Sequence, residues 1–556
     1  MARFNTLCAY LVFFIVLSNN AFAQKLTLTI TSKDSLDAIF LKKINFKKTH
    51  WSEKSIYSEL DSVSENLKHY GYFLNVVDSV KKKDSVYYSY FTLNKKVEKV
   101  ILSIPFNQEK IIDYPVKNGI IELDIANLSN FLKTTSNKLE NQGKSFSEVK
   151  LKNIRLKQNV LFADLNIKPS KKRTIDRIIV KGYSKFSKSY LYHFLNIKKG
   201  VTFNKEKLIE ISKSIESLPF VSEIKSPEIL FSKDSTILYL YIKKKRASSF
   251  DGLINFASKE NSKGLLFNGY INLQLNNSID TGEQFELFWK ANGEERQQFK
   301  VLTDIPYIFN TSFSPNFSFT IYKQDSTFLN TKFHSAIGYN VNAKTTISLT
   351  YDAESSNSTL KNNTNNLIQD FDNSFLGIQF KYQYAANDTF LNNRLYVKIN
   401  PSFGSRTDNS VKNNQFKIDF EASYLWLLNQ RNAIYVRNET GYLNSDSYLT
   451  NELYRIGGVN SIRGFNEQAI VTPQFSYLNF EYRYLTSQNS YVYSITDVGN
   501  IKTINAENKT IYGLGFGYLF YLKKSQISLG YALGKVSDSD FNLNQSKLLI
   551  KIISFF

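Results

Sequence analysis

The stretch "FKIDFEASYLW", residues 416–426, decides the fold because its side chains alternate in character at every position. One parity is apolar: Phe416, Ile418, Phe420, Ala422, Tyr424 and Trp426. The other parity is polar: Lys417, Asp419, Glu421 and Ser423. A period of two indicates a β-strand with one apolar and one polar face. Segments of about ten such residues are typical of a transmembrane β-barrel.

The same alternation continues from about residue 250 to the last residue. It predicts sixteen strands, near 250–258, 264–275, 281–292, 296–305, 314–323, 328–340, 344–353, 372–385, 390–403, 414–428, 432–444, 474–486, 490–500, 509–521, 524–535 and 546–556. An even number suits an antiparallel bacterial barrel. The polar run "ESSNSTLKNNTNN" (354–366) fits an extracellular loop. We therefore expect a transmembrane antiparallel β-barrel of about sixteen strands over residues 247–556.

A soluble β-sandwich could also alternate, but the end of the chain argues against it. The last strand, "KLLIKIISFF", places Leu548, Ile550, Ile552 and the terminal Phe556 on one parity. A terminal aromatic residue on an apolar strand face suits the membrane interface. Phe556 is therefore a candidate signal of the C-terminal strand.

The N-terminus has the order of a secretory signal peptide. Arg3 precedes the apolar run "LCAYLVFFIVL", and the small residues "AFA" end at Ala23. We expect residues 1–23 to be removed. Cleavage would also remove Cys8, the single cysteine, so the mature protein would have neither disulfide nor thiolate chemistry.

Charge divides the chain into two regions. Residues 24–250 hold 42 Lys and Arg against 23 Asp and Glu, whereas residues 251–556 hold 27 against 26. This asymmetry indicates two regions in different surroundings. Anionic lipid head groups, acidic client segments or simple solvation explain the basic region. Nucleic acid is not expected as a partner of a secreted chain.

The basic region contains three similar helical segments. Helices are predicted near 53–70 and 124–141 and after Asn204, and each ends at a helix-breaking residue followed by phenylalanine. The breaking residues are Gly71, Gly143 and Pro219, which lie 72 and 76 residues apart. Such a spacing is typical of repeated modules.

Strand-like runs flank these helices, so each module is predicted to be a small α+β unit with an open sheet. The predicted modules are residues 24–95, 96–170 and 171–246. An open sheet has an unpaired edge to which an extended peptide can add as another strand. The alternative is that the modules are simple spacers.

The loop "RIGGVNSIRGFNEQ", residues 455–468, joins the eleventh and twelfth predicted strands. Here the chain resembles the outer-membrane protein assembly and secretion superfamily that includes BamA, TamA and the two-partner secretion transporters. Members have periplasmic POTRA modules before a sixteen-stranded barrel, and a loop that folds back into the barrel with a "(V/I)RG(F/Y)" tip. Ile462, Arg463, Gly464 and Phe465 match this tip, and Gly457 and Gly458 match the glycines before it.

The resemblance implies that Arg463 lies inside the barrel, where a guanidinium keeps its charge and needs carboxylate partners. Glu481 and Asp497, on the next two predicted strands, are the candidates. Gly513, Gly515 and Gly517 share one face of the fourteenth strand and would leave room for the loop. The alternative is that Arg463 is an ordinary solvated loop residue and that the glycines only permit bending.

The resemblance further implies insertion of β-barrel proteins into the outer membrane, or transport of polypeptides across it, with the modules in the periplasm. The seam between the first and last strands would open to template a client strand. The implied partners are unfolded clients, membrane lipids and an accessory protein of the periplasm or inner membrane. Three modules resemble the arrangement in TamA. A two-partner secretion transporter and a passive channel remain alternatives.

An enzyme is not expected, nor is a cofactor. The four histidines, His50, His69, His193 and His334, lack the spacing of metal ligands. The sequence has neither a nucleophile elbow nor a phosphate-binding glycine loop.

Overall fold

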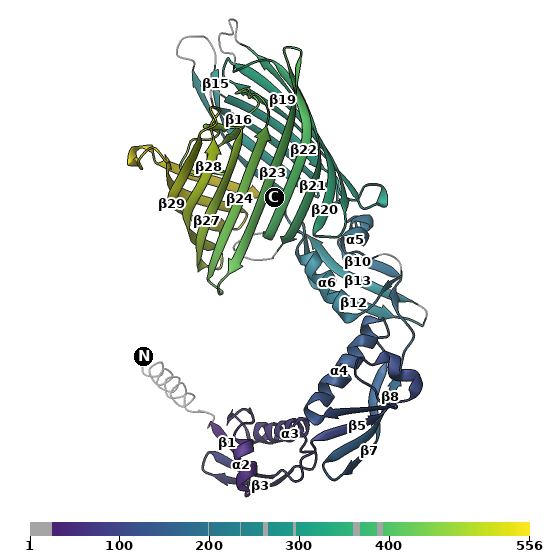
Figure 1. Cartoon of the computed structure of the whole chain (residues 1–556). Helices are drawn as coiled ribbons and strands as arrows, with labels where there is room; N and C mark the ends of the chain where they lie inside the picture. Colours follow the sequence, from purple (N-terminus) through teal and green to yellow (C-terminus); the bar gives the residue numbers. More distant parts are fainter. Residues whose placement is uncertain are drawn as a thin grey trace, which may run out of the picture. The chain divides into compact units, whose positions relative to one another are not determined.

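The computed structural model describes residues 25–197, 200–233, 235–258, 265–292, 296–359, 367–385 and 393–556 (Figure 1). The predicted signal peptide, residues 1–23, lies outside the described residues. The described chain forms two compact units. The first contains two small α+β modules, and the second contains a third module and a β-barrel.

The first module packs two helices on a four-stranded sheet. Its elements are β1 (Leu26–Thr31), α2 (Ser35–Leu41), β2 (Thr49–His50), α3 (Glu53–His69), β3 (Val76–Lys83) and β4 (Val86–Thr92), with sheet order β2-β1-β4-β3. Ser52 caps α3 by accepting a hydrogen bond from the Ser55 N–H. The apolar face of α3 is buried: Ile56, Leu60, Val63 and Leu67.

The second module repeats this plan. Its elements are β5 (Lys99–Ser103), η1 (Phe106–Ile111), β6 (Ile120–Asp124), α4 (Ile125–Asn141), β7 (Glu148–Lys157) and β8 (Val160–Lys168), with sheet order β6-β5-β8-β7. In both modules a parallel pair at the sheet centre is followed by an antiparallel strand at one edge, β3 or β7.

The third module belongs to the second unit. It contains β9 (Thr174–Ile175), β10 (Arg177–Gly182), α5 (Lys188–Phe194), β11 (Val201–Thr202), α6 (Lys205–Glu216), β12 (Val221–Phe231) and β13 (Thr236–Lys244). Its main sheet has the order β10-β13-β12, so β12 is an edge strand. The three main sheets fall within residues 24–95, 96–170 and 171–246.

Three short helical segments were not expected from the sequence. These are α2, η1 and α5, each of six or seven residues. Two turns are too few to establish a helical period, which explains why only the longer helices α3, α4 and α6 were predicted.

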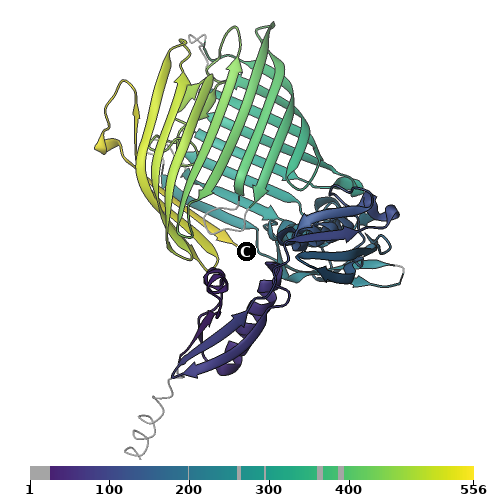
Figure 2. The same cartoon turned by 60° about the horizontal axis from the view of Figure 1, so that its bottom comes forward.

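Sixteen antiparallel strands close into a barrel (Figures 1 and 2). They are β14 (Ser249–Ser258), β15 (Leu265–Asn276), β16 (Gln284–Asn292), β17 (Arg296–Asp304), β18 (Phe313–Gln324), β19 (Phe328–Asn340), β20 (Thr345–Ser358), β21 (Phe371–Ala385), β22 (Asn393–Asp408), β23 (Val411–Leu427), β24 (Asn432–Asn444), β27 (Gln474–Ser487), β28 (Ser490–Lys502), β29 (Asn508–Leu522), β30 (Ser525–Val536) and β31 (Lys547–Phe555). The fold class and strand number expected from the sequence are confirmed.

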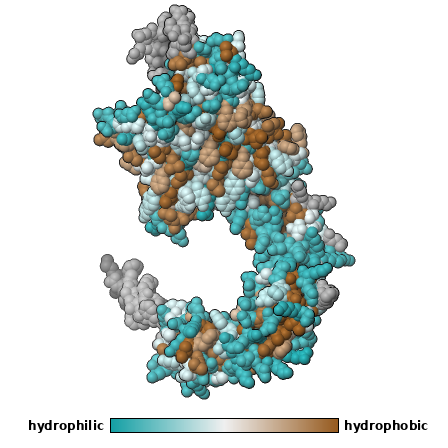
Figure 3. Space-filling model, viewed as in Figure 1, coloured by the Kyte–Doolittle hydropathy of each residue, from teal (hydrophilic) through white to brown (hydrophobic). Residues whose placement is uncertain are grey.

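The outer face of the barrel is apolar. Figure 3 shows hydrophobic residues gathered on the barrel wall between hydrophilic surfaces. Exposed apolar side chains occur at alternate positions along single strands, as in Leu548, Ile550 and Ile552 of β31. An apolar band of this kind faces lipid, so the strands cross the membrane.

The strands β20 and β22 both continue five residues beyond their predicted ends. The sequence placed their ends near 353 and 403, whereas β20 ends at Ser358 and β22 at Asp408. Ser358 still pairs with Phe328, and Asp408 pairs with Val411. The backbone ladder therefore continues where apolar alternation has stopped. The predicted extracellular loop 354–366 was wrong over residues 354–358, and residues 360–366 lie outside the described residues.

The closure between the first and last strands is short. Among the described residues, β14 pairs with β31 only through Ser249 with Phe555 and Phe250 with Ser554. On its other side β31 pairs with β30 from Ser525 with Ser554 to Ala532 with Lys547. Within the described residues, most of β31 therefore has no strand partner at this seam.

No helix in the described part of the chain is both long enough and apolar enough to cross a membrane.

We predict that Gly71→Ala loosens the junction between the first two modules. Gly71 has φ +97°, and an added Cβ would lie 2.1 Å from the Val97 carbonyl oxygen. The Val97 N–H also donates to the Gly71 carbonyl at 2.9 Å. Left-handed backbone in a non-glycine residue costs about 1–3 kcal/mol. Faster hydrogen exchange across α3 in the full chain is expected, and unchanged exchange would contradict the prediction.

Candidate functional site: a loop held inside the barrel

The connection between β24 and β27 enters the barrel. It contains two short strands, β25 (Tyr454–Ile456) and β26 (Ile470–Thr472), which pair as an antiparallel ribbon. The segment between them carries the predicted tip. The ribbon and tip pack on the inner wall in an apolar cluster that includes Ile456, Ile462 and Phe465. Ile462 is completely buried, so this loop is not a solvated surface segment.

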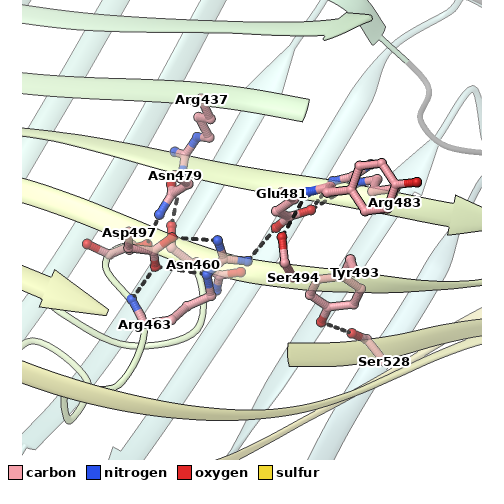
Figure 4. Close-up of polar contacts among 12 residues, drawn as sticks. Arg437, Asn460, Arg463, Asn479, Glu481, Arg483, Tyr493, Ser494, Asp497 and Ser528 are labelled. Atoms are coloured by element: carbon pink, nitrogen blue, oxygen red, sulfur yellow. Dashed lines mark hydrogen bonds and ion pairs between the residues drawn. The ribbon is translucent and has the colours of Figure 1, made fainter. Parts of the chain in front are cut away.

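Arg463 makes the central contact of the site (Figure 4). Its backbone N–H and its Nε donate to Asp497 Oδ2 at 2.8 and 2.9 Å, and its Nη2 donates to Asp497 Oδ1 at 2.6 Å. Its Nη1 pairs with Glu481 Oε1. The side chain of Arg463 is 8% exposed and that of Asp497 is fully buried. The structure thus brings the loop arginine to both carboxylates named from the sequence.

Glu481 is shared with a second arginine. Arg483, on the same face of β27, donates to Glu481 Oε2 from Nε at 2.8 Å and from Nη2 at 2.5 Å. Its guanidinium also lies over the rings of Tyr435 and Tyr491. Two cations and two carboxylates therefore form one buried network. Buried charges are tolerated when they are paired in this way.

The tip lies against the backbone of β29 and β30. Gly464 has φ +93°, and a Cβ there would lie 2.4 Å from the Gly534 nitrogen. A Cβ on Gly513 would lie 2.3 Å from the Arg463 carbonyl oxygen. The approach therefore requires glycine on both the loop and the wall.

The expected role of the other two β29 glycines was wrong. A Cβ on Gly515 would meet the Tyr531 carbonyl oxygen of the neighbouring strand, and one on Gly517 would meet the Tyr493 ring. Of the three β29 glycines, only Gly513 makes room for the loop. Alternation along the strand predicted which face each glycine occupies. It did not predict the position along β29 at which the loop makes contact.

The two glycines before the tip shape the loop. Gly457 and Gly458 have φ values of +111° and +106°. A Cβ on Gly457 would lie 2.6 Å from the Asn466 carbonyl oxygen. One on Gly458 would lie 2.2 Å from the Glu467 carboxylate. Both positions therefore need glycine for their left-handed backbone, and Gly457 also needs it for space beside the Asn466 carbonyl.

Further polar contacts that were not predicted fix the loop elsewhere. At its base, the fully buried Arg406 of β22 pairs with Glu452 and with Asp408 Oδ2, the latter at 2.7 Å. Near the tip, Arg437 donates to the Asn460 carbonyl at 2.9 Å. Arg406 lies beyond the predicted end of its strand and 46 residues from Glu452, so local patterns carried no signal for this pair.

A cavity of about 1340 Å³ occupies the end of the barrel that carries the third module. Residues of α6, several barrel strands and the loop residue Tyr454 line it. Its charged lining is mixed in sign and includes Lys300, Lys398, Asp352 and Glu439. The cavity is therefore a polar vestibule that is lined by charges of both signs.

The third module is attached to two turns of the barrel. Tyr190 of α5 packs over Gly282 and meets the Tyr307 ring edge to face at 5.0 Å. Lys244 pairs with Asp280 at 2.8 Å. The hydrogen bonds of Lys244 and Tyr183 lower the pKa of the Asp280 carboxyl. The module is thus coupled to the turns that precede β16 and β18.

The remaining predicted site residue, Phe556, follows β31. It is exposed, and its N–H donates to the Ser248 carbonyl at 3.0 Å. Its role as a C-terminal signal stays a prediction.

No group of three or more His, Cys, Asp or Glu side chains within the described residues lies in an arrangement suited to a metal ion.

Comparison with known proteins identifies two family matches. Residues 289–520 match the family described as haemolysin secretion/activation protein ShlB/FhaC/HecB, and residues 173–245 match POTRA, described as surface antigen variable number repeat. No curated protein sequence matches the chain.

Solved structures show the same fold. The chain is similar to CdiB from Escherichia coli, with 12% identity and a TM-score of 0.52 over 89% of this chain and 98% of that one. It is also similar to CdiB from Acinetobacter baumannii, with 14% identity and a TM-score of 0.51 over 83% of this chain and 90% of that one.

The fold and site define an outer-membrane barrel with periplasmic POTRA modules and an inward loop. The chain carries the match to the ShlB/FhaC/HecB family in its barrel and the match to POTRA in its third module, which is consistent with the outer-membrane protein assembly and secretion superfamily. It acts in the assembly of outer-membrane proteins or the transport of polypeptides across that membrane. Members of the matched family handle secreted polypeptide clients. The barrel lies in the outer membrane, with the POTRA region in the periplasm.

We predict that Arg463→Ala releases the tip. The change leaves Asp497 buried without its arginine partner, which costs about 3–5 kcal/mol, whereas Glu481 keeps its contact with Arg483. Arg463→Lys should recover only part of this, because an ammonium group cannot bond both carboxylates through a planar fork. The temperature at which the folded barrel loses its compact gel mobility should fall in the order wild type, Lys, Ala. Arg431→Ala, at an exposed turn, is the control. The same transition temperature in all four proteins would contradict the prediction.

Proposed function

We propose that this protein inserts client β-barrels into the outer membrane by pairing client strands with the free edge of the seam. The observation that carries the proposal is the closure of β14 on β31 by two residue pairs alone within the described residues. A strand edge with unpaired N–H and C=O groups is a template for another strand. In lipid, such groups need partners, so an incoming client strand satisfies them.

The loop supports this use of the seam. It fills the lumen beside β27 to β30 through the Arg463 and Gly464 contacts. With the interior occupied, the wall beside the seam keeps its curvature when the seam parts. A client then enters laterally rather than through the lumen.

The modules supply earlier binding steps. Their edge strands β3, β7 and β12 offer main-chain groups to unfolded clients by strand addition. Lysine and arginine recur along β7, at Lys150, Lys152, Arg155 and Lys157. Membrane lipids and an accessory protein of the periplasm or inner membrane are further proposed partners. The three-module arrangement favours an accessory assembly factor similar to TamA. No step requires covalent catalysis, so we propose a non-enzymatic role.

Transport of a dedicated secreted polypeptide is the second candidate. It is favoured by the match of residues 289–520 to a family described by haemolysin secretion and activation. In this case the polypeptide passes through the lumen, and the loop must leave its position. The two candidates therefore differ in whether the seam or the lumen opens.

A disulfide across the seam separates them. In a chain without other cysteines, Phe250→Cys with Ser554→Cys joins β14 to β31 at a facing pair. Oxidation should abolish the acceleration of client barrel folding into vesicles, and reduction should restore it. The same oxidation should leave lumenal secretion unchanged.

The matched control uses the same position on β31. Ser525→Cys with Ser554→Cys joins β30 to β31. The hydroxyl oxygens of these two serines lie 3.3 Å apart. This disulfide leaves the seam free, so client folding should continue. Full activity of the oxidised Phe250–Ser554 pair variant would overturn the proposed insertion at the seam.

A further inference from the structure

The geometry points to a latch inside the barrel, in which Glu467 and Gln468 of the loop hold β16 and β17 while the tip holds the opposite side of the seam. These two residues follow the tip after Asn466 and were not candidates from the sequence. The latch depends on one element of the proposed function, namely that the barrel opens at the seam.

The contacts toward the first strands come from both the main chain and the side chains of the loop. Arg296 Nη1 of β17 donates to the Glu467 carbonyl at 2.7 Å. Lys290 of β16 lies 3.4 Å from the Glu467 carboxylate. Gln468 Nε2 donates to Gln298 Oε1 at 3.1 Å. Register places Lys290 opposite Gln298, and Arg296 lies two residues before Gln298 on the same strand, so these three side chains share the inner face.

The contacts toward the last strands lie on the same short segment. Arg463 bonds β27 and β28, and Gly464 lies on the backbone of β30. Lys551 of β31 itself donates to Asn460 Oδ1 at 3.3 Å. Gln468, which holds one side of the seam, therefore lies only four positions after Gly464 of the tip, which holds the other side.

The segment is internally braced, so displacement at one end reaches the other. Glu467 Oε1 accepts the Val459 N–H at 2.9 Å, and its carboxylate fills the space left by Gly458. The Gln468 N–H donates to the Gly457 carbonyl at 3.2 Å. These contacts join Glu467 and Gln468 to the segment that begins at the predicted glycines Gly457 and Gly458.

The two sets of contacts differ in strength. The side chains of Lys290 and Glu467 are 33% and 42% exposed, whereas those of Arg463 and Asp497 are 8% and 0% exposed. Exposed ion pairs contribute little, whereas breaking a buried pair is strongly unfavourable. When the seam parts, the Glu467 side releases first and the tip stays with β27 to β30. Arg296 and Lys290 are therefore positioning residues that set the closed population of the seam.

Distance measurement across the seam tests this without a client. Spin labels at Phe250→Cys and Ile552→Cys, both on the exposed outer face, report separation of β14 from β31 by pulsed electron resonance in lipid bilayers. Lys290→Gln with Arg296→Gln should raise the separated fraction roughly tenfold, because hydrogen bonds to charged groups shift an equilibrium by about this factor. Arg296→Lys keeps a charged donor and should retain most of the closed population.

The control removes the same charges elsewhere. Lys412→Gln with Arg431→Gln changes two exposed positions and should leave the distances unchanged. Compact gel mobility before heating establishes that each barrel has folded. Equal separated fractions in the latch variant, the control and the wild type would overturn the latch.

Client folding by the same variants separates this inference from the proposed function. A wider seam with unchanged client folding supports the latch and contradicts insertion at the seam. The second outcome combines two results. The distances in the Lys290→Gln, Arg296→Gln variant are unchanged, and the Phe250–Ser554 disulfide still blocks client folding. This combination contradicts the latch alone.

Discussion

The charge of Arg463 is the constraint on which the interior of the barrel depends. A guanidinium does not give up its proton in a protein, so a loop that carries it into the lumen must find carboxylates. Asp497 and Glu481 supply them from adjacent strands, and Arg483 balances the second carboxylate. With the side chain fixed, the backbone of the tip reaches β29 and β30 so closely that Gly464, Gly513 and Gly534 cannot carry a Cβ without a clash. One ion-pair network thus determines where the loop ends and which wall it touches.

The same network bears on the short closure of the barrel wall between β14 and β31. Along most of the barrel, neighbouring strands share long ladders, whereas β14 and β31 share two described pairs. A membrane barrel with so short a closure needs support from inside. The loop provides it through contacts with β27 to β31 on one side and with β16 and β17 on the other. The part of the wall that is poorest in main-chain bonds is therefore the part that the loop bridges, which makes the seam the natural place for controlled opening.

The sequence predicted the features that depend on local periodicity. Alternation located all sixteen strands, because each strand has one face in lipid and one in the lumen. Gly71 and Gly143 marked helix ends because both require left-handed backbone, with φ values of +97° and +82°. The parity of Glu481 placed it inside.

Contacts between distant segments had no local signal. Arg406 with Glu452 and Glu467 with Arg296 depend on the path of the loop across the lumen, and α2 and α5 are too short to establish a period. The different roles of Gly513 and Gly517 were hidden for the same reason.

Photocrosslinking of a client during its insertion tests the central claim most directly. A photoreactive residue replaces Ile550 on β31 beside the seam or, as the matched position, Ile378 on β21; both side chains face outward and are 54% and 62% exposed. If clients insert at the seam, a folding client barrel should crosslink at residue 550 and not at residue 378. Equal crosslinking at the two positions, or crosslinking only to residues lining the lumenal cavity, would contradict it.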